Sequence, residues 1–524
     1  MSTAPSRERL QHLKLLLLIF IFLAQFFFFA FVALHRFIDG DEGFYLLASR
    51  LVLLHKKPYL DFFYTQAPLL PYIYALWMKV AGVTWVSAKI FSALLTAILA
   101  TLVCEEVWHE TRNWLAGLSA AILFATSSLI FGFFPVVKTF SLAGLFLFAA
   151  YLLVSRTSVT SARWPMLLAG LLFGFSVSTR SYLVLVLPVL LWWVLQNTEP
   201  GARQTALLSF LGGFVLGIAP CLYFFAASPR AFLFNNLGYH ALRSEGGLVG
   251  MWQQKFVALL QVFLLGPESN GIQTSLLFFI SLAFLSSLPK RGSAARLAFQ
   301  IAVVVGLVSL LPTPVHPQYF CLCIPFLLVT AVCVANDYLT ELQPGRGKRL
   351  AAAGCVFLIG LYAAASVQDF RRYLVTGDGV AGVEPGLAQD CRLEHVLAVS
   401  KAINQVVHPG EAVASFWPGF IFQTKAVPFP GFENDFGLPV AEDLSAEQRA
   451  RYHILSAGEI EGDFAAHRPR VVVLRDHILV PTPVKYREKV RRLEDTFRAA
   501  LLQERYTRIR TVGDMSIYVY GAER

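Results

Sequence analysis

The segment IDGDEGFYL, residues 38–46, places three carboxylates, Asp39, Asp41 and Glu42, directly after a long apolar stretch. Like charges repel one another at such short spacing, which weighs against simple solvation of a loop. A carboxylate at the lipid–water boundary can act as a general base toward a hydroxyl or amine, and its oxygens also suit a divalent cation. Capping of the following helix by Asp41 or Glu42 is a plain alternative that is compatible with catalysis.

The composition determines the class of protein in which these carboxylates act. Of the 524 residues, 56% are hydrophobic and 15% are charged, whereas roughly a quarter are charged in soluble proteins. The mean hydropathy is +0.57, and the apolar residues occur in long blocks, so the sequence predicts a polytopic membrane protein. The formal net charge of +10 fits basic cytoplasmic loops and lipid headgroups better than nucleic acid.

Apolar runs of about 17–25 residues predict membrane-spanning helices. Eleven candidates, several of them shorter than this, lie near residues 13–34, 84–105, 114–131, 138–154, 165–178, 182–196, 204–226, 274–288, 297–312, 319–336 and 350–366. The basic loops PKRGSAAR and PGRGKRL favour a cytoplasmic N-terminus, because Lys and Arg accumulate in cytoplasmic loops. An odd number of spans then puts the C-terminal region outside.

Between and after these runs the sequence predicts two long outside loops and one soluble domain. The first loop, 35–83, contains GFYLLASRLVLLHKK and APLLPYIYALWMKVAG, which are typical of helices lying in the membrane interface. The second loop covers 227–273. The expected fold is therefore an all-α polytopic membrane bundle, residues 1–370, followed by a small extracytoplasmic α/β domain, residues 371–524, in which strand-like and helix-like runs alternate.

The first outside loop also resembles that of a known family. An Asp-Glu pair, an amphipathic helix and an aromatic segment leading into a Pro-containing helix follow one another as Asp41-Glu42, 43–55 and YLDFFYTQAPLLPY. This order resembles the GT-C fold glycosyltransferases that use polyprenyl-phosphate sugars, most closely the RgtA/B/C/D-like group. That group is related to the lipid A aminoarabinose transferase and the protein O-mannosyltransferases. LLFGFSVSTRSYLVL and HPQYFCLCIPFL resemble later parts of the same family.

The resemblance implies that Asp41 is the catalytic base and Glu42 its partner, with either one as a ligand of any divalent metal. On the predicted topology several cations share the outside face with Asp41, where they coordinate the donor phosphate or, for Lys and Arg, snorkel to lipid headgroups. The expected phosphate-binding residues are Lys138, Arg180, His316 and Tyr319. The expected substrate-binding residues are Asp61, Tyr64 and Gln66, although Asp61 also suits a helix cap and Tyr64 an interfacial aromatic belt.

Three departures from the family pattern leave the donor sugar and the metal requirement open. Phe44 stands where the aminoarabinose transferases have an Arg, and Thr65-Gln66-Ala67-Pro68 stands where they have Glu-Lys before the Pro. Many relatives carry an acid in the second short outside loop, where this chain has Lys138. None of these changes removes the expected base.

The expected function is that of an integral membrane glycosyltransferase, an enzyme of the bacterial inner membrane with its C-terminal domain outside. It would move a hexosyl or pentosyl unit from polyprenyl phosphate to a glycolipid, polysaccharide or protein of the cell envelope, with inversion of the anomeric centre. No nucleic-acid partner is expected, and the sequence specifies no cofactor. The alternative is a transporter or flippase of lipid-linked sugars, although the spans contain few acids and show no matched halves. The sequence does not specify the sugar, the acceptor or the oligomeric state.

Overall fold

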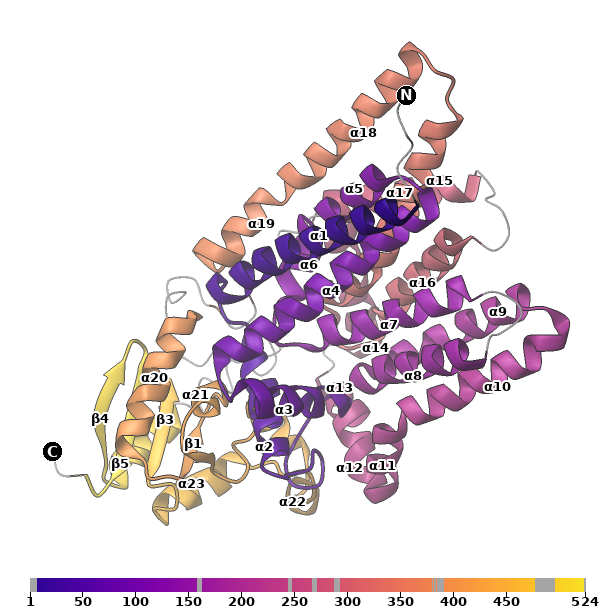
Figure 1. The fold of residues 1–524 in the computed structure, drawn as a ribbon. Helices are drawn as coiled ribbons and strands as arrows, with labels where there is room; N and C mark the ends of the chain where they lie inside the picture. Colours follow the sequence, from indigo (N-terminus) through magenta and orange to yellow (C-terminus); the bar gives the residue numbers. More distant parts are fainter. Residues whose placement is uncertain are drawn as a thin grey trace.

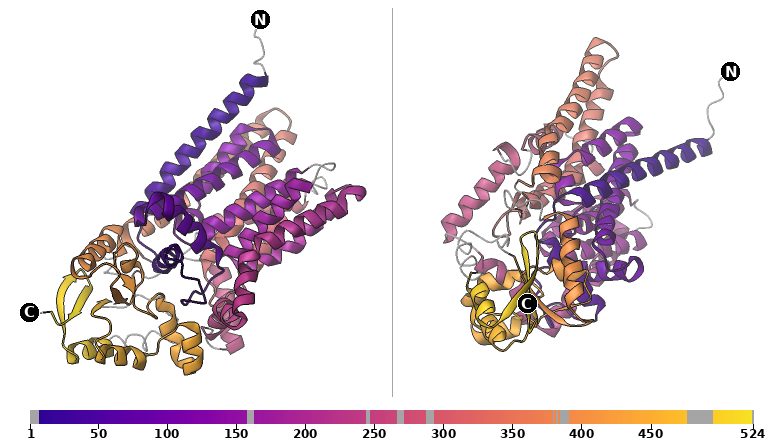
Figure 2. Two further views of the ribbon diagram at one scale, coloured as in Figure 1. Left: turned by 60° about the horizontal axis from the view of Figure 1, so that its bottom comes forward. Right: turned by 90° about the vertical axis from the view of Figure 1, so that its left-hand side faces the viewer.

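A bundle of apolar helices carries a small sheet at one end in the computed structural model of the chain (Figure 1). The N-terminus lies toward the opposite end of the bundle, as the turned views also show (Figure 2). The structure describes residues 7–157, 163–243, 247–265, 271–286, 293–378, 380, 383, 391–475 and 495–522.

Five helical stretches within the described residues are long and apolar enough to cross a membrane, or six if one helix pair bent by 52° counts as a single span. They comprise α1 (Arg7–His35), α4 (Trp85–Thr111), α7 (Thr139–Arg156), η4 with α17 (Pro317–Cys323 and Ile324–Glu341), α18 to η5 (Arg346–Ala365, Val367–Arg371 and Arg372–Thr376), and the bent pair α10 (Pro200–Gly217) and α11 (Ala219–Ala227). Each of these six coincides with one of the eleven predicted spans.

The other five predicted spans fall on helices shorter than the 18 residues that this length test requires. These helices are α5 (Trp114–Ala125) with α6 (Ser128–Phe133), α8 (Arg163–Thr179), η1 (Ser181–Val186) with α9 (Leu187–Asn197), α15 (Gly271–Ser286) and α16 (Ala294–Val308). A continuous apolar run therefore overstates helix length, because it does not register breaks such as the one between α5 and α6.

The two predicted interfacial stretches of the first loop are helical. They form α2 (Glu42–Leu53) and α3 (Leu69–Ala81), which pack against each other beside the sheet (Figure 1). The second loop contains α12 (Pro229–Leu233), η2 (Phe234–Gly238), α13 (Tyr239–Leu242), α14 (Gly247–Leu260) and η3 (Gln261–Leu265). Both loops therefore supply ordered elements at the end of the bundle that carries the sheet.

Helix α8 is positioned by close backbone packing against α10. A Cβ atom added at Gly170 would lie 1.9 Å from the carbonyl oxygen of Phe210, and one at Gly213 would lie 1.9 Å from that of Leu167. Only glycine permits such an approach, as is common between membrane helices. The contact fixes the end of α8 and thereby the position of Arg180, the residue that follows it.

The C-terminal region contains a five-stranded sheet of order β2-β1-β3-β5-β4. Its strands are β1 (Ala412–Ser415), β2 (Val427–Pro428), β3 (Val471–Arg475), β4 (Tyr506–Val512) and β5 (Met515–Tyr520). Strand β1 pairs in parallel with β2 and β3, whereas β5 is antiparallel to its neighbours β3 and β4. The predicted strands at 471–476 and 516–521 are thus confirmed as β3 and β5. Position 476 lies outside the described residues.

Helices surround this sheet, as the alternating pattern predicts. They are α20 (Leu393–Val406), α21 (Gly419–Phe422), η7 (Asp435–Asp443), α22 (Ala446–Tyr452) and α23 (Ala457–Ala465). The segment LEHVLAVSKAINQVV forms α20. The first half of KYREKVRRLEDTFRAALLQE lies outside the described residues, and 495–503 of its second half is helical.

Candidate active site

The loop before α2 is shaped by its own carboxylates. Asp39 Oδ1 accepts a hydrogen bond from the backbone N–H of Asp41 at 3.1 Å, and Glu42 Oε1 accepts one from the N–H of Asp39 at 3.0 Å. These two hydrogen bonds order the turn that leads into α2, and neither involves an N–H group within the helix. Asp41 makes no capping hydrogen bond, so the capping alternative does not hold for it and its carboxylate is left for other contacts.

Lys138, almost a hundred residues later in the chain, neutralises two of these acids. Its ammonium Nζ lies 2.8 Å from Asp39 Oδ1 and 2.9 Å from Asp41 Oδ2, and it donates to Gln318 Oε1 at 3.2 Å. Burial disfavours its charge, but the carboxylates of Asp39 and Asp41 outweigh burial and raise the pKa of Lys138. The side chain of Asp41 remains 23% exposed, so this pair reaches the protein surface at one point.

Glu42 is turned away from that surface. It is fully buried and pairs with Lys89 of α4, whose Nζ lies 3.0 and 2.9 Å from its two oxygens. Glu42 Oε2 also accepts from the backbone N–H of Val137 at 3.2 Å. Glu42 thus binds the backbone near both Asp41 and Lys138. These contacts place the carboxylate of Asp41 beside the ammonium of Lys138.

A cavity of about 110 Å³ opens beside Asp41. Its walls come from the first loop, the end of α6, the second loop, the start of η4 with the residue before it, and the C-terminal region. The lining residues are Asp41, Phe44, Tyr45, Thr65, Gln66, Phe133, His240, Arg243, His316, Pro317, Gln318, Tyr319 and Phe436. Five segments that are far apart in the sequence therefore meet around one carboxylate.

Two guanidinium groups give this cavity its positive side. Arg243 lines it directly and lies over the ring of Tyr239 at 5.5 Å. Arg180 lies behind the wall, with its guanidinium 4.9 Å from the ring centre of Tyr319 and a hydrogen bond of 2.5 Å to Thr139 Oγ1. Together with the ammonium of Lys138 they form a cluster of cations that suits an anionic group such as phosphate.

The two histidines of the cavity are uncharged at neutral pH. Burial and the positive charge of Arg243 lower the pKa of both His240 and His316 to about 4. A ring nitrogen of His240 lies 3.1 Å from the carbonyl oxygen of Thr65. These rings therefore offer hydrogen bonds rather than charge to a bound group.

The C-terminal region contacts the loop before α2 through hydrogen bonds and close backbone packing. The indole Nε1 of Trp417 donates to the carbonyl oxygen of Gly40 at 2.9 Å. A Cβ atom at Gly43 would lie 2.7 Å from the backbone nitrogen of Gly419. The two backbone segments touch there, so position 43 requires glycine. Arg50 of α2 donates to the carbonyl oxygen of Ala426 at 2.7 Å. Phe436 adds a wall to the cavity itself, since its ring centre lies 5.0 Å from that of Phe44.

The structure brings together most, but not all, of the residues that the sequence predicts for the site. Asp41, Gln66, His316 and Tyr319 line the cavity, and Lys138 and Arg180 contact its walls. Three other predicted residues do not line it. Glu42 is buried behind the loop, Asp61 accepts a hydrogen bond from the backbone of Lys57 at 2.7 Å in an exposed turn, and Tyr64 packs in a cluster of aromatic rings.

Sequence reasoning misses several residues of the cavity or its support, among them His240, Arg243, Tyr45, Phe436, Lys89 and Trp417. The spacing of His240 and Arg243 in YHALR, which places two cationic residue types on one helix face of an outside loop, is a signal for the first two. Phe436 and Trp417 carry no local signal, because only the docking of the C-terminal region brings them here.

Divalent metal binding at Asp41 or Glu42 stays a prediction. Within the described residues no group of three or more His, Cys, Asp and Glu side chains is arranged to hold a metal ion. The oxygens of Asp39, Asp41 and Glu42 that have partners face Lys138, Lys89 or backbone N–H groups.

The architecture around this cavity matches solved structures of known enzymes. ArnT from Cupriavidus metallidurans, bound to undecaprenyl phosphate, superposes with a TM-score of 0.64 at 13% identity, covering 96% of this chain and 98% of that one. The chain has the GT-C fold. The apo state of the same ArnT gives a TM-score of 0.63. The mycobacterial arabinofuranosyltransferase AftD gives 0.53 at 15% identity, and this chain spans 40% of its length.

No protein-family model and no curated protein matches this chain by sequence. The likeness to ArnT and AftD therefore lies in the arrangement of the helices and the C-terminal region. At 13–15% identity it establishes the fold, whereas the chemistry has to be argued from the cavity of this chain.

Proposed function

We propose that this chain is an integral membrane glycosyltransferase that moves a sugar from a polyprenyl-phosphate donor to an envelope acceptor. One observation carries the proposal: a carboxylate with no capping role, Asp41, shares a cavity with Arg243 and pairs with Lys138 at its edge. A proton acceptor and cations suited to a phosphate thus lie side by side. ArnT, whose fold this chain shares, was crystallised with undecaprenyl phosphate, which supports a donor of that class.

The proposed reaction needs a base and a stabilised leaving group. Asp41 takes the proton of the acceptor's hydroxyl or amine as that atom attacks the anomeric carbon from the face opposite the phosphate. The bond from the anomeric carbon to the phosphate oxygen breaks, its electron pair stays on the phosphate, and the anomeric centre is inverted. Lys138, Arg243 and Arg180 balance the charge that grows there, and His316, Tyr319 and Gln66 offer hydrogen bonds.

Donor binding changes the charge balance around Asp41. In this structure the ammonium of Lys138 is shared among Asp39, Asp41 and Gln318. A phosphate that draws on the same ammonium weakens its hold on Asp41 and makes that carboxylate a stronger base. The arrangement thereby links the presence of the donor to the readiness of the base.

We propose the orientation from the basic loops PKRGSAAR and PGRGKRL, which favour a cytoplasmic N-terminus. The N-terminus lies in the cytoplasm of a bacterial cell, the membrane is the inner membrane, and the cavity with the region 371–524 lies on the outer face. The acceptor is a glycolipid, polysaccharide or protein of the envelope, which reaches the cavity from the side of the sheet.

The variant Asp41→Asn tests the function. We expect it to lose about 100- to 10,000-fold in transfer of radiolabelled sugar from polyprenyl phosphate in membranes of the producing strain, because a general base in this role contributes roughly 10²–10⁴-fold. Glu447→Gln, which neutralises an exposed carboxylate of α22 whose side chain is 80% accessible, is the control and retains transfer. Full transfer by Asp41→Asn, or movement of the lipid-linked sugar across liposomes without any transfer, would overturn the proposal.

A further inference from the structure

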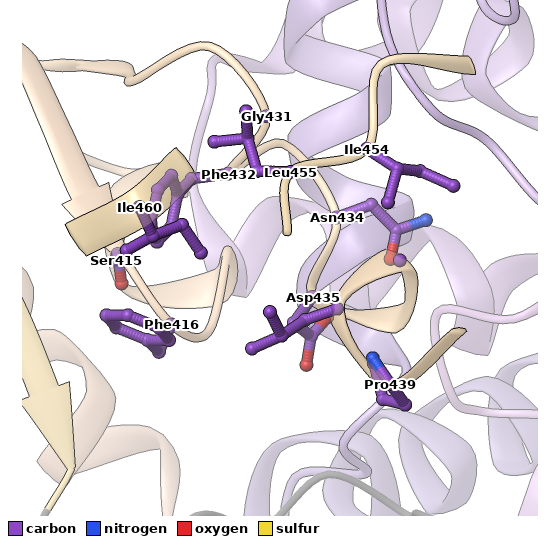
Figure 3. Close-up of a pocket in the computed structure, with 12 residues that line it drawn as sticks. Ser415, Phe416, Gly431, Phe432, Asn434, Asp435, Pro439, Ile454, Leu455 and Ile460 are labelled. Carbon is purple, nitrogen blue, oxygen red and sulfur yellow. The ribbon is translucent and has the colours of Figure 1, made fainter. Parts of the chain in front are cut away.

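A second cavity lies in the C-terminal region, at the end of strand β1. Ser415 and Phe416, at the C-terminal end of that strand, form one side of it (Figure 3). Strand β1 lies between β2 and β3 in the sheet, and β5 and β4 follow beyond β3. The strand order therefore reverses its direction at β1. Ligands of sheets with parallel strands bind at such a reversal, beyond the carboxyl ends of the strands. The cavity thus occupies the position at which sheets of this kind bind ligands.

The wall of this cavity includes a polar atom whose hydrogen bonding is incomplete. Oδ1 of Asp435 is buried and has no hydrogen-bond partner among the described residues. The hydroxyl of Ser415 donates to the carbonyl oxygen of Trp417 at 2.7 Å, and Asn434 Oδ1 accepts from the N–H of Phe436 at 3.0 Å. The remaining walls are largely apolar and include Phe432. A buried polar atom without a partner is costly, so a ligand that satisfies it would gain that energy.

Neighbouring residues at the start of η7 line the two cavities. Phe436 points to the cavity of Asp41, where its ring contacts that of Phe44, while Asp435 lines the second cavity. Burial, and then the negative charge of Asp41, raise the pKa of Asp435 to about 8. At neutral pH its carboxyl is thus mostly protonated, and it can both donate and accept a hydrogen bond.

We propose that this second cavity is an acceptor subsite that takes a neutral hydroxyl or hydroxymethyl group, with the carboxyl of Asp435 as its hydrogen-bond partner. The inference rests on the proposed function, since the acceptor is the substrate that must extend from Asp41 toward the sheet. The cavity volume of about 30 Å³ admits a group of one or two heavy atoms, because one water needs roughly 10–15 Å³ on this scale. A sugar hydroxymethyl matches that size, the apolar walls and the single polar partner.

Binding of methyl hexosides tests the subsite without any transfer reaction. Methyl glycosides of glucose, mannose and galactose, at concentrations up to about 100 mM, are offered to the full chain in nanodiscs, and saturation transfer to the ligand protons is recorded by NMR. The wild-type chain is expected to bind at least one of them. Asp435→Asn, which keeps a neutral hydrogen-bonding group, retains binding, whereas Asp435→Leu lowers it at least about fivefold. Glu447→Gln is the matched control, and Asp41→Asn also retains binding.

Two further measurements keep the outcome readable. Leu438→Trp fills the cavity from a partly exposed position of η7 and should abolish binding even if Asp435→Leu fails to fold. The 6-deoxy analogue of the bound hexoside should bind more weakly than its parent. The proposal is overturned if no hexoside binds, if Asp435→Leu and Leu438→Trp bind as the wild type does, or if Asp435→Asn loses as much as Asp435→Leu, which would show that a neutral hydrogen-bonding group at this position does not support binding. Failure of the proposed function is seen separately, as full transfer by Asp41→Asn.

Discussion

Helix α4 carries a cluster of charged side chains near each of its ends, and the two clusters differ in one respect. Near its start, Lys89 pairs with Glu42, which adjoins the pair of Asp41 and Lys138 at the cavity. Near its end, Glu105 accepts from Lys14 at 3.1 Å and also pairs with Arg156. Both clusters hold acids and bases in the bilayer-spanning part of a helix or next to it, where unpaired charges are costly.

The cluster near the end of α4 is closed on itself. Glu106 is fully buried, and its two oxygens accept from Tyr151 at 2.9 Å and from Arg156 at 2.8 Å. In the other cluster Asp39 Oδ2 has no partner among the described residues, and Asp41 is open to a cavity. In this chain, the charge cluster that leaves an oxygen unpaired and reaches a cavity is therefore the candidate active site. The cluster whose charges are paired with one another connects helices instead.

The largest contrast between the clusters is expected from Lys138→Met and Arg156→Met. Each variant removes a cation shared by two carboxylates, so both should lower the thermal unfolding midpoint. Only Lys138→Met should also lower the transfer rate per folded molecule, by about 100–1000-fold, because it removes a group placed to stabilise the leaving phosphate. Transfer assays normalised to the monodisperse fraction check this. An equal loss per folded molecule in Arg156→Met would remove the distinction.

The support of the outer cluster is tested by Lys89→Met, alone and with Glu42→Gln. The single variant leaves a buried carboxylate unpaired, which costs about 3–5 kcal/mol of stability. The double variant should recover most of the thermal stability, because it buries no charge. It should not recover transfer, since the amide of Gln cannot accept from both the Asp39 and Val137 N–H groups that Glu42 holds. Recovery of both properties would show that Glu42 only balances Lys89.

A smaller effect is expected from the contact between the C-terminal region and the loop before α2. Trp417→Phe removes the hydrogen bond to Gly40 and keeps an aromatic ring, so kcat should fall about fivefold, in line with the roughly 1 kcal/mol that one hydrogen bond contributes. The KM for the lipid donor should change little. Trp77→Phe removes a comparable indole hydrogen bond, to Ser87 of α4 at 2.9 Å, away from the loop, and serves as the matched control.

The smallest effect concerns Asp435 and pH. Its pKa is raised to about 8 in the folded chain, from an ordinary value of 3.8. The folded state therefore holds this proton more tightly than the unfolded state, and stability is lost as pH rises from about 4 through about 8. Asp435→Asn does not titrate, so its unfolding midpoint relative to the wild type should rise over that range, by about 2–5 °C at pH 9. A difference that does not vary with pH would contradict the raised pKa.

Much of this molecule is determined by patterns within short stretches of sequence. Long apolar blocks predict membrane helices, and six of the eleven predicted spans coincide with helical stretches that pass the length test. The alternating runs near 471 and 516 are confirmed as strands β3 and β5. Asp41 is identifiable because three acids follow an apolar helix. These features depend on periodicity and polarity, which the chain expresses locally.

The arrangement of the site was decided only by tertiary packing. Lys138 meets Asp41 because Glu42 holds the backbone of Val137, and no local pattern in FFPVVKTF predicts that contact. The same packing separates the two adjacent acids, leaving Asp41 on the cavity and turning Glu42 to Lys89. Phe436 and Trp417 reach the loop from almost four hundred residues away. Such contacts depend on how distant surfaces fit together, and that information is not contained in the spacing of residues along one segment.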